Sequence, residues 1–424
     1  MLSVSKHGKY GIAVDIGTTN ITINLVDHDN NNILSQRSLR NPQFPYGSDI
    51  ISRISYSTKG PANQAILVDI VRDAVKMGIK GILQEHNLEP SSVYTITIVG
   101  NTVMHHLFFD LSLESHTRPP FKATNKESIL IECSDVGLSF LNNAQCYSPP
   151  VVESFIGPDA IAVLIASGFL EKNEIRLAID VGTNTEVSLV TPRGIWIASG
   201  ASGPAFEGMA TECGIIGEMG AIKQVRINPK TYEPILSVIG ESEPRGICGT
   251  GAVSVMSSLL DTGLFLPRGS LNRDIKTKWL SFAGNIGKYI LAFANISATG
   301  KDIFIAQTDL RMLQQSKSAI RGVIEMVLKR ARCTSEDIIE VLVTGVFGSD
   351  LDIEDVYRIG MFPKFDQAKI TQVKNSAIEG ATLLLDEKNR ERVQTLVDEL
   401  NYIELTEEEE FKKLFLEFLP FPSR

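Results

Sequence analysis

Two short segments of this chain combine residue types that bind phosphate groups and metal ions. Residues 14–20 read VDIGTTN, and residues 179–185 read IDVGTNT. In each segment an apolar run ends in an aspartate, and a glycine with hydroxyl or amide residues leads into a second apolar run. The pattern predicts a β-hairpin in which the glycine lets backbone N–H groups come close to an anion.

The side chains of the two turns predict a site for a phosphate chain and a metal ion. We expect the carboxylates of Asp15 and Asp180 to order the water ligands of Mg²⁺ and an attacking water, so they are the candidate catalytic and metal-binding residues. One such turn is also an ordinary loop sequence, whereas two in one chain fit two related lobes that close on one phosphate chain. The expected phosphate donors are Gly17, Thr18, Thr19, Gly182, Thr183 and Asn184.

The composition excludes several classes of protein. The length of 424 residues allows two or three domains with sizeable cores. The formal net charge of −9, without a cluster of basic and aromatic residues, argues against a nucleic-acid partner. The longest apolar run, at 160–170, is too short to span a bilayer, and the N-terminus lacks the apolar core of a secretion signal. We therefore expect a cytoplasmic protein without a membrane partner.

The five cysteines are scattered and show no C-x-x-C spacing. They are Cys133, Cys146, Cys213, Cys248 and Cys333. This arrangement indicates reduced thiols, interpreted mainly as small buried residues, and it predicts no iron–sulfur cluster on this chain.

Apolar periodicity predicts alternating strands and helices in both halves of the chain. His105 and His106 fall within an apolar helix and are interpreted as core residues. Near the C-terminus, the apolar residues within 411–419 share one face and predict docking onto the body of the protein. The expected elements are strands over 11–38, 94–101 and 340–346, hairpins over 177–199, and helices over 64–86, 102–111, 155–170, 249–263 and 308–332.

Eight longer segments, in one order along the chain, resemble a known family. They are similar to segments of the ATP-dependent reductive activators of corrinoid proteins, a branch of the acetate and sugar kinase, Hsp70 and actin (ASKHA) superfamily. The resemblance covers about residues 10–420. Its segments are NPQFPYGSDIISRISY at 41–56, VGNTVMHHL at 99–107, IDVGTNTEVSLV at 179–190, ASGPAFEGM at 201–209, RGICGTGAV at 245–253, QTDLRMLQQSKSAIRGVI at 307–324, VLVTGVFGSDLDIEDVYRIGMFP at 341–363 and AIEGATLLL at 377–385.

The resemblance implies an α/β fold of two actin-like, ribonuclease H-like lobes with an ATP cleft between them. Residues 9–170 would form the first lobe, which is the middle domain of the activators. Residues 171–424 would form the second, which is their C-terminal domain with its closing helices. The Gly-rich and Gly-Pro segments of the second half then supply further nucleotide-binding residues, namely Gly203, Glu207, Gly249, Thr250, Gly251, Gly345 and Gly348.

The same resemblance implies an activity and its partners. The expected activity is ATP binding and hydrolysis, with Mg²⁺, that supports reduction of a corrinoid protein from Co(II) to Co(I) for methyl transfer. The expected partners are that corrinoid protein and its methyltransferase, and a homodimer is left open.

Three departures from the family pattern bear on these expectations. Members usually carry an N-terminal 2Fe–2S domain or C-terminal 4Fe–4S segments, whereas this chain starts at the nucleotide-binding body and ends at LPFPSR. We therefore expect a truncated form whose electron carrier is a separate protein. Val346 replaces the second glycine of the adenosine motif in TGVFG, and Met219 adds bulk to the run GEMGAI.

Two other functions stay open at this point. A small-molecule kinase of the same superfamily would need a catalytic base beside a substrate pocket, and the sequence identifies none. A non-catalytic ATP-binding module is suggested by the altered adenosine turn at Val346.

Overall fold

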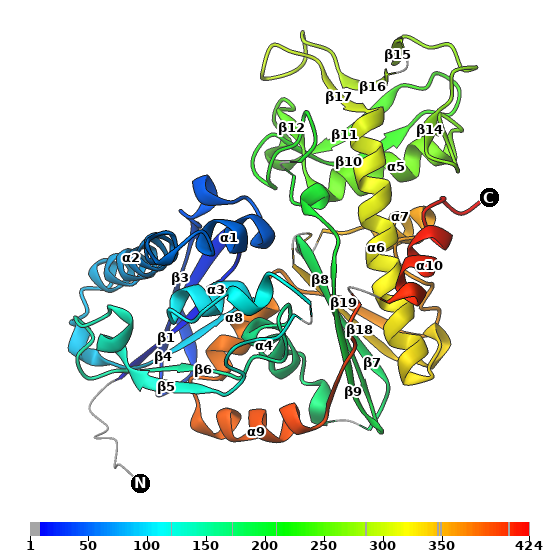
Figure 1. Ribbon diagram of the computed structural model, residues 1–424. Helices are drawn as coiled ribbons and strands as arrows, with labels where there is room; N and C mark the ends of the chain where they lie inside the picture. The colour runs from blue at the N-terminus through cyan, green and yellow to red at the C-terminus, as the bar shows by residue number, and fades with distance from the viewer. Residues whose placement is uncertain are drawn as a thin grey trace. The chain divides into compact units, whose positions relative to one another are not determined.

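The chain divides into two compact units, each with its own hydrophobic core. The computed structural model describes residues 9–119, 121–171, 173–208, 210–284, 286–345, 347, 350–405 and 408–423. Met1–Lys172 and Asn375–Tyr402 form the first unit, and Asn173–Lys374 and Ile403–Arg424 form the second (Figure 1). The chain therefore passes between the units a second time, before Asn375, and this second crossing has no counterpart in the sequence prediction.

A six-stranded sheet in the order β3-β2-β1-β4-β6-β5 forms the centre of the first unit. The pairs β1–β2, β2–β3 and β5–β6 are antiparallel, whereas β4 is parallel to β1 and to β6. The strands are β1 (Tyr10–Ile16), β2 (Asn20–Asp27), β3 (Asn32–Arg40), β4 (Val93–Gly100), β5 (Ile129–Glu132) and β6 (Gln145–Ser148).

Helices pack on both faces of this sheet. Ile23 and Asn24 of β2 point to opposite faces, as neighbours on a strand do. Ile23 lies against Gly78 of α2, and the amide of Asn24 donates a hydrogen bond of 3.1 Å to Thr382 of α8. The helices of the unit are α1 (Ile50–Ser57), α2 (Pro61–Glu85), α3 (Thr102–Phe108), α4 (Pro158–Ser167), α8 (Ser376–Leu383) and α9 (Glu387–Asp398), and the short strand β20 (Leu400–Tyr402) follows α9.

Helices α4 and α8 approach each other closely, although one follows the other by some two hundred residues. A β-carbon at Gly380 of α8 would lie 1.9 Å from the carbonyl oxygen of Ala162 in α4. Only glycine permits that backbone approach. Helix α8 is therefore an integral layer of the first unit.

The second unit repeats the strand arrangement of the first. Its large sheet contains the order β19-β18-β7-β8-β9, in which β7, β8 and β9 are antiparallel and β18 is parallel to β7. The first unit has the same pattern, with β1, β2 and β3 in place of β7, β8 and β9, and β4 in place of β18. The strands are β7 (Arg176–Val181), β8 (Asn184–Thr191), β9 (Gly194–Ala201), β18 (Glu340–Gly345) and β19 (Lys369–Gln372).

Small sheets and four helices complete the second unit. Helix α6 packs on β8 and β9, and α5 packs on β10. The helices are α5 (Gly249–Asp261), α6 (Gln307–Ala331), α7 (Ile353–Ile359) and α10 (Glu409–Glu417). The remaining strands are β10 (Ala221–Ile227), β11 (Pro234–Val238), β12 (Gly246–Ile247), β13 (Phe265–Leu266), β14 (Ser270–Leu271), β15 (Leu280–Ala283), β16 (Ile286–Ala292) and β17 (Ile303–Ala306).

The predicted α/β class is confirmed, with two shortened helices. The helix predicted over 155–170 is limited to α4, because Pro158 occupies its start and Gly168 adopts a left-handed conformation with φ of 66° at its end. The helix predicted over 102–111 ends at Phe108, and Asp110 has a positive φ of 54°. No helix in the described part of the chain is long and apolar enough to cross a membrane.

The predicted docking of the C-terminal segment is confirmed. Phe411 and Leu414 of α10 pack against the core of the second unit, and Figure 1 shows α10 beside α6. Three polar side chains of α6 donate hydrogen bonds to backbone carbonyls of the C-terminal segment. Gln314 donates to Leu419 at 2.9 Å, Lys317 to Pro420 at 2.8 Å, and Ser318 to Phe415.

Three histidines lie buried together in the first unit. His105 and His106 of α3 have their Nδ1 atoms 3.4 Å apart, and the ring of His116 lies 5.2 Å from that of His106. Burial lowers the pKa of all three imidazoles, that of His106 to about 4. The expectation that His105 and His106 are core residues is confirmed.

We predict that the stability of the first unit falls as the pH drops below 6.5. The unfolded chain binds protons at the ordinary histidine pKa, whereas the buried rings resist protonation until a lower pH. A ring that stays neutral in the folded state therefore removes about 1.4 kcal/mol of stability per pH unit below the ordinary histidine pKa. In urea denaturation between pH 7.5 and 5, His106→Leu should show a shallower decline than the wild type.

The exposed His86 provides the matched control. His86→Gln should decline like the wild type. Because the raised pKa of Asp15 acts in the opposite direction and is common to all three proteins, it cancels in the comparison. Equal slopes for His106→Leu and the wild type would contradict the prediction.

Candidate functional site

The first predicted turn, between β1 and β2, is held from one side by the segment that follows β3. Three backbone carbonyls of the turn accept hydrogen bonds from two residues of this segment. The amide side chain of Asn41 donates to Gly17 at 2.9 Å, Nη2 of Arg53 donates to Thr18 at 2.5 Å, and the backbone N–H of Asn41 donates to Thr19 at 2.8 Å.

This capture of the carbonyls orients the N–H groups of the turn. In a planar trans peptide the C=O and the following N–H point in opposite directions. With the carbonyls of Gly17 and Thr18 directed at Asn41 and Arg53, the N–H groups of Thr18 and Thr19 point to the other side of the turn. The turn thus presents backbone donors on one side, as an anion site requires.

Asp15 lies in the last part of β1, before this turn, and its carboxylate is partly buried. Burial raises the pKa of Asp15 to about 6, and a hydrogen bond of 3.1 Å from the Asn375 side chain acts against this rise. Asn375 also caps α8, because its side-chain oxygen accepts from the backbone N–H of Ile378. A desolvated carboxylate with a single amide donor is a suitable group for a cation or for water held by one.

Asn101 supports the same turn from the start of α3. Its side-chain oxygen caps the helix at Met104 N, and its amide donates to the hydroxyl of Thr18 at 3.1 Å. The backbone there is tightly stacked, because a β-carbon at Gly100 would lie 2.6 Å from the carbonyl oxygen of Ile16, and one at Gly157 would lie 2.3 Å from that of Gly100. The segment 99–107 thus fixes the hydroxyl of Thr18.

The second predicted turn, between β7 and β8, uses the same device with different residues. The carbonyl of Thr183 accepts from the backbone N–H groups of Ser202 at 3.1 Å and Gly203 at 2.8 Å. The hydroxyl of Ser202 donates to the carbonyl of Gly182 at 3.0 Å. Gly203 has a positive φ of 76°, which explains a glycine at this point. The end of β9 therefore holds the carbonyls of this turn, as Asn41 and Arg53 hold those of the first.

Two acidic residues lie beside the second turn. Glu207, directly after the short helix η6 (Pro204–Phe206), accepts a hydrogen bond from the hydroxyl of Thr183. Asp180 lies next to Gly345 at the end of β18, where a β-carbon would meet its carboxylate oxygen at 2.6 Å and the carbonyl oxygen of Val181 at 2.2 Å. The bare backbone of Gly345 leaves the space that this carboxylate occupies.

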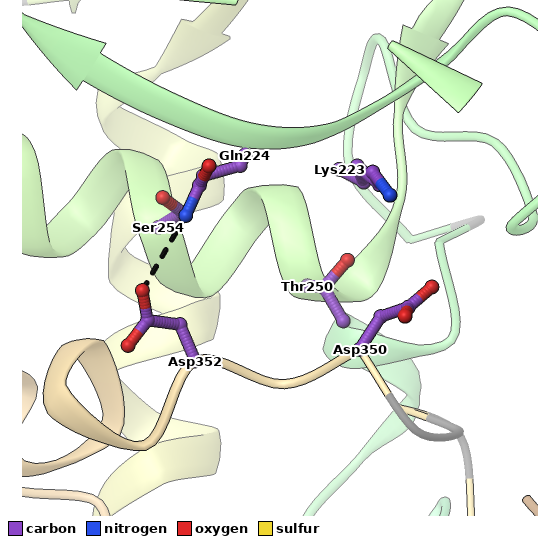
Figure 2. Close-up of a pocket in the computed structure, with 6 residues that line it drawn as sticks. All are labelled: Lys223, Gln224, Thr250, Ser254, Asp350 and Asp352. Carbon is purple, nitrogen blue, oxygen red and sulfur yellow. Dashed lines mark hydrogen bonds between the residues drawn. The ribbon is translucent and has the colours of Figure 1, made fainter. Parts of the chain in front are cut away.

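A pocket of about 140 Å³ lies beside the start of α5 in the second unit. Figure 2 shows Lys223 and Gln224 from β10 along one side, and Asp350 and Asp352 along the other. Thr250 and Ser254 of α5 complete the lining, and Gln224 donates a hydrogen bond of 3.4 Å to Asp352 (Figure 2). The pocket offers both donors and acceptors, which suits a polar ligand.

The glycines that flank Thr250 have a packing role. A β-carbon at Gly249 would lie 2.1 Å from the carbonyl oxygen of Phe206, and one at Gly251 would lie 2.0 Å from that of Ile222. These two glycines let α5 approach η6 and β10, so close packing accounts for their residue type. Thr250 alone of the three lines the pocket.

The structure thus places the predicted residues in three groups. Asp15, Gly17, Thr18 and Thr19 surround the first turn, and Thr250 belongs to the pocket. Gly348 and Val346 lie outside the described residues. Met219, expected to add bulk, is 66 % exposed. The group at the second turn consists of Asp180, Gly182, Thr183, Asn184, Gly203, Glu207 and Gly345.

The sequence reasoning missed the residues that hold the turns. Asn41, Arg53, Asn101, Asn375 and Ser202 bind turn carbonyls, a turn hydroxyl or Asp15. The one available signal was polar residues within apolar surroundings, such as the arginine of IISRISY.

Two cysteines of the first unit are buried thiols. Burial raises the pKa of Cys133 to about 12 and that of Cys146 well above its ordinary value. Among the described residues, no group of three or more His, Cys, Asp or Glu is arranged to hold a metal ion.

Comparison with known proteins defines the class first. Residues 174–424 match the family described as "C-terminal domain of RACo the ASKHA domain", and residues 10–172 match the "RACo middle region". A solved structure titled as a reductive activator for a corrinoid, iron–sulfur protein has a TM-score of 0.89 and 28% identity, covering 99% of this chain and 67% of that one. The fold is therefore of the ASKHA type, as predicted.

Two relatives of known function are similar to this chain along most of its length. "Corrinoid activation enzyme RamQ" of Eubacterium limosum is 30% identical over 417 residues, which cover 96% of this chain and 69% of RamQ. The Co(II) methylated amine-specific corrinoid protein reductase of Methanosarcina barkeri is 25% identical over 414 residues, with 90% and 71% covered. The chain belongs to the RACo family, so the predicted family is confirmed.

We predict that Gly345→Ala destabilises the second unit and displaces Asp180. The φ of 99° at Gly345 strains any residue with a β-carbon, and that carbon would also collide with the carbonyl of Val181. We expect a loss of about 3 kcal/mol in urea denaturation. Gly300→Ala is the matched control, because Gly300 has a φ of 65° and open space around it, and it should cost only about 1 kcal/mol. Equal losses would show that the close approach to Asp180 is unimportant.

Proposed function

We propose that this protein is an ATP-dependent activator that supports reduction of a corrinoid protein from Co(II) to Co(I) for methyl transfer. The main support is membership of the RACo family along nearly the whole chain, together with relatives named for corrinoid activation and for reduction of a Co(II) corrinoid protein. The two turns with oriented backbone donors are the features that such an ATP-using protein needs.

We propose that each turn is a phosphate-binding element for MgATP. The donors are the backbone N–H groups and hydroxyls of the residues predicted from sequence, chiefly Thr18, Thr19 and Thr183. Glu207 bonds to the Thr183 hydroxyl, so a phosphate there would compete with or redirect that bond. In this way the segment 203–208 would respond to the presence of the γ-phosphate.

Asp15 and Asp180 are the proposed residues for Mg²⁺ and its waters. The fit rests on chemistry, because Mg²⁺ prefers oxygen ligands and retains several waters. It also rests on the desolvated carboxylate of Asp15, which a cation would stabilise in its charged form. Bound Mg²⁺ would neutralise phosphate charge and lower the pKa of a coordinated water.

We propose that the pocket beside α5 binds the nucleoside part of ATP. Asp350, which lines it, lies five positions after Gly345, the last residue of β18, where the adenosine motif was predicted. Thr250, Lys223 and Asp350 offer the polar contacts that a ribose or an adenine requires.

The electron for cobalt is proposed to come from a separate protein. The scattered cysteines, which show no C-x-x-C spacing, support this view. We further propose a cytoplasmic setting, where thiols stay reduced. The corrinoid protein and its methyltransferase are the proposed partners.

We predict that a non-hydrolysable MgATP analogue raises the melting temperature. A ligand at 100 times its Kd adds about 2.7 kcal/mol to stability. Asp15→Asn and Asp180→Asn should weaken the Mg²⁺ dependence of the shift, and Gly182→Val should abolish binding by filling the turn. Asp69→Asn, at an exposed position on α2, is the control and should behave as wild type. Absence of any shift with adenine or guanine nucleotides would refute the site.

We predict that the ATPase rate is low for the protein alone and rises with a Co(II) corrinoid protein. A partner can act only if it prefers one nucleotide state, and ATP must then change the affinity for that partner by the same factor. Calorimetric titration with Co(II) and Co(I) partner, each with and without ATP, tests this reciprocity. Equal affinity in all four titrations would exclude the activator role, and turnover that needs an added alcohol or carboxylate would favour a kinase.

A further inference from the structure

Arg53 is a buried cation whose contacts are all neutral. Its side chain is 0% exposed, deep in the first unit. Nε donates to the carbonyl of Gly47 at 3.0 Å, Nη1 donates to Oε1 of Gln43 at 3.1 Å, and Nη2 donates to the carbonyl of Thr18 at 2.5 Å. Nη1 also lies 3.0 Å from the sulfur of Met104.

No carboxylate of the described residues forms an ion pair with this guanidinium. Asp49 acts on it from a distance, while the carboxylate of Asp49 caps α1 by accepting from Ser52 N at 2.9 Å. Burying a charge among neutral acceptors is costly, and truncating it would leave several acceptors unsatisfied. Such an arrangement is retained at a cost in stability, and an anion brought nearby would reduce that cost.

Another buried arginine among the described residues shows the contrast. Arg176 of β7 is 2% exposed and is paired with two carboxylates, Glu174 and Glu340. Its charge is balanced within its own unit. Arg53 instead directs its charge at the peptide that forms the predicted phosphate turn.

The peptide between Thr18 and Thr19 links Arg53 to the side where a phosphate would bind. Its carbonyl accepts from Nη2, and its N–H points the opposite way. A hydrogen bond from a cation polarises the peptide and makes its N–H a stronger donor. The positive charge would thus reach an anion through the peptide that separates the two.

We propose that Arg53 is a positioning residue that orients and polarises the β1–β2 turn for the nucleotide phosphates and supplies their buried countercharge. The proposal rests on the proposed nucleotide function. It assigns a role to segment 41–56, which the two turns and their aspartates leave without one.

Gln43→Glu gives the sharpest test, because it puts a carboxylate oxygen where Oε1 of Gln43 accepts the hydrogen bond from Arg53. The new carboxylate would neutralise the charge of the guanidinium locally, while the hydrogen bonds that Arg53 donates to Thr18 and Gly47 stay in place. We expect the affinity for a non-hydrolysable MgATP analogue, measured by calorimetry, to fall about tenfold and its salt dependence to flatten. The protein should remain folded because the new carboxylate is paired with Arg53, although the Leu67 carbonyl loses the 2.8 Å hydrogen bond that Nε2 of Gln43 donates to it. A purely structural role for Arg53 predicts unchanged affinity.

Substitutions of Arg53 itself provide the second measurement. Arg53→Met removes charge and bonds and should lower affinity at least tenfold, whereas Arg53→Lys keeps the charge and should recover part of it. Arg72→Met is the matched control. Arg72 lies in the same unit and donates to the backbone carbonyl of Phe108 at 2.8 Å, away from the turn. The affinity of this variant for the nucleotide analogue should stay within twofold of the wild-type value. All affinities are compared below the melting temperature of each variant.

The outcomes separate the inference from the function on which it rests. If the wild type binds no nucleotide, the proposed function fails. If the wild type binds and both Gln43→Glu and Arg53→Lys bind equally well, the role of Arg53 is refuted and the nucleotide site stands. If Arg53→Met does not fold, Gln43→Glu still decides the question.

Discussion

The structure depends on turning the backbone of two short loops so that their N–H groups face a ligand. A peptide presents its N–H group in one direction when its carbonyl is held in the other direction by a donor. In the first unit Asn41 and Arg53 donate to the turn carbonyls, and in the second Ser202 and Gly203 donate to them. The two loops share a sequence pattern, while the residues that hold them share none.

Much of the fold follows from the sequence because periodicity reports burial. The helix predicted over 308–332 is α6, Gln307–Ala331, and the repeated strand pattern follows from the repeated hairpin. The residues that hold the turns escape such reasoning, because a side chain that binds a backbone carbonyl needs no matching partner in the sequence. Asn375 is an extreme case, since it meets Asp15 across 360 residues. Gly249 and Gly251 show the converse, because their residue type reflects close packing as well as any ligand.

Two groups of opposite charge are desolvated near the first turn. Asp15 is partly buried with one amide donor, and Arg53 is fully buried with neutral acceptors. Each charge is unfavourable alone, and magnesium and phosphate have the signs that would balance them. A folded chain that buries both charged groups is destabilised by them before any ligand binds. A preorganised site differs in this respect from an arrangement that only stabilises the fold.

The return of residues 375–402 to the first unit affects how this unit folds during its synthesis on the ribosome. The chain leaves this unit at Lys172 and comes back at Asn375, so at 5–20 residues per second its last layer is synthesised about 10 to 40 s after the rest. During that interval the surface of α4 that receives Gly380, and the Gly11 position that receives Leu385, stay uncovered. The nascent first unit therefore exposes apolar surface during that interval, and Asp15 gains its hydrogen bond from Asn375 only after it.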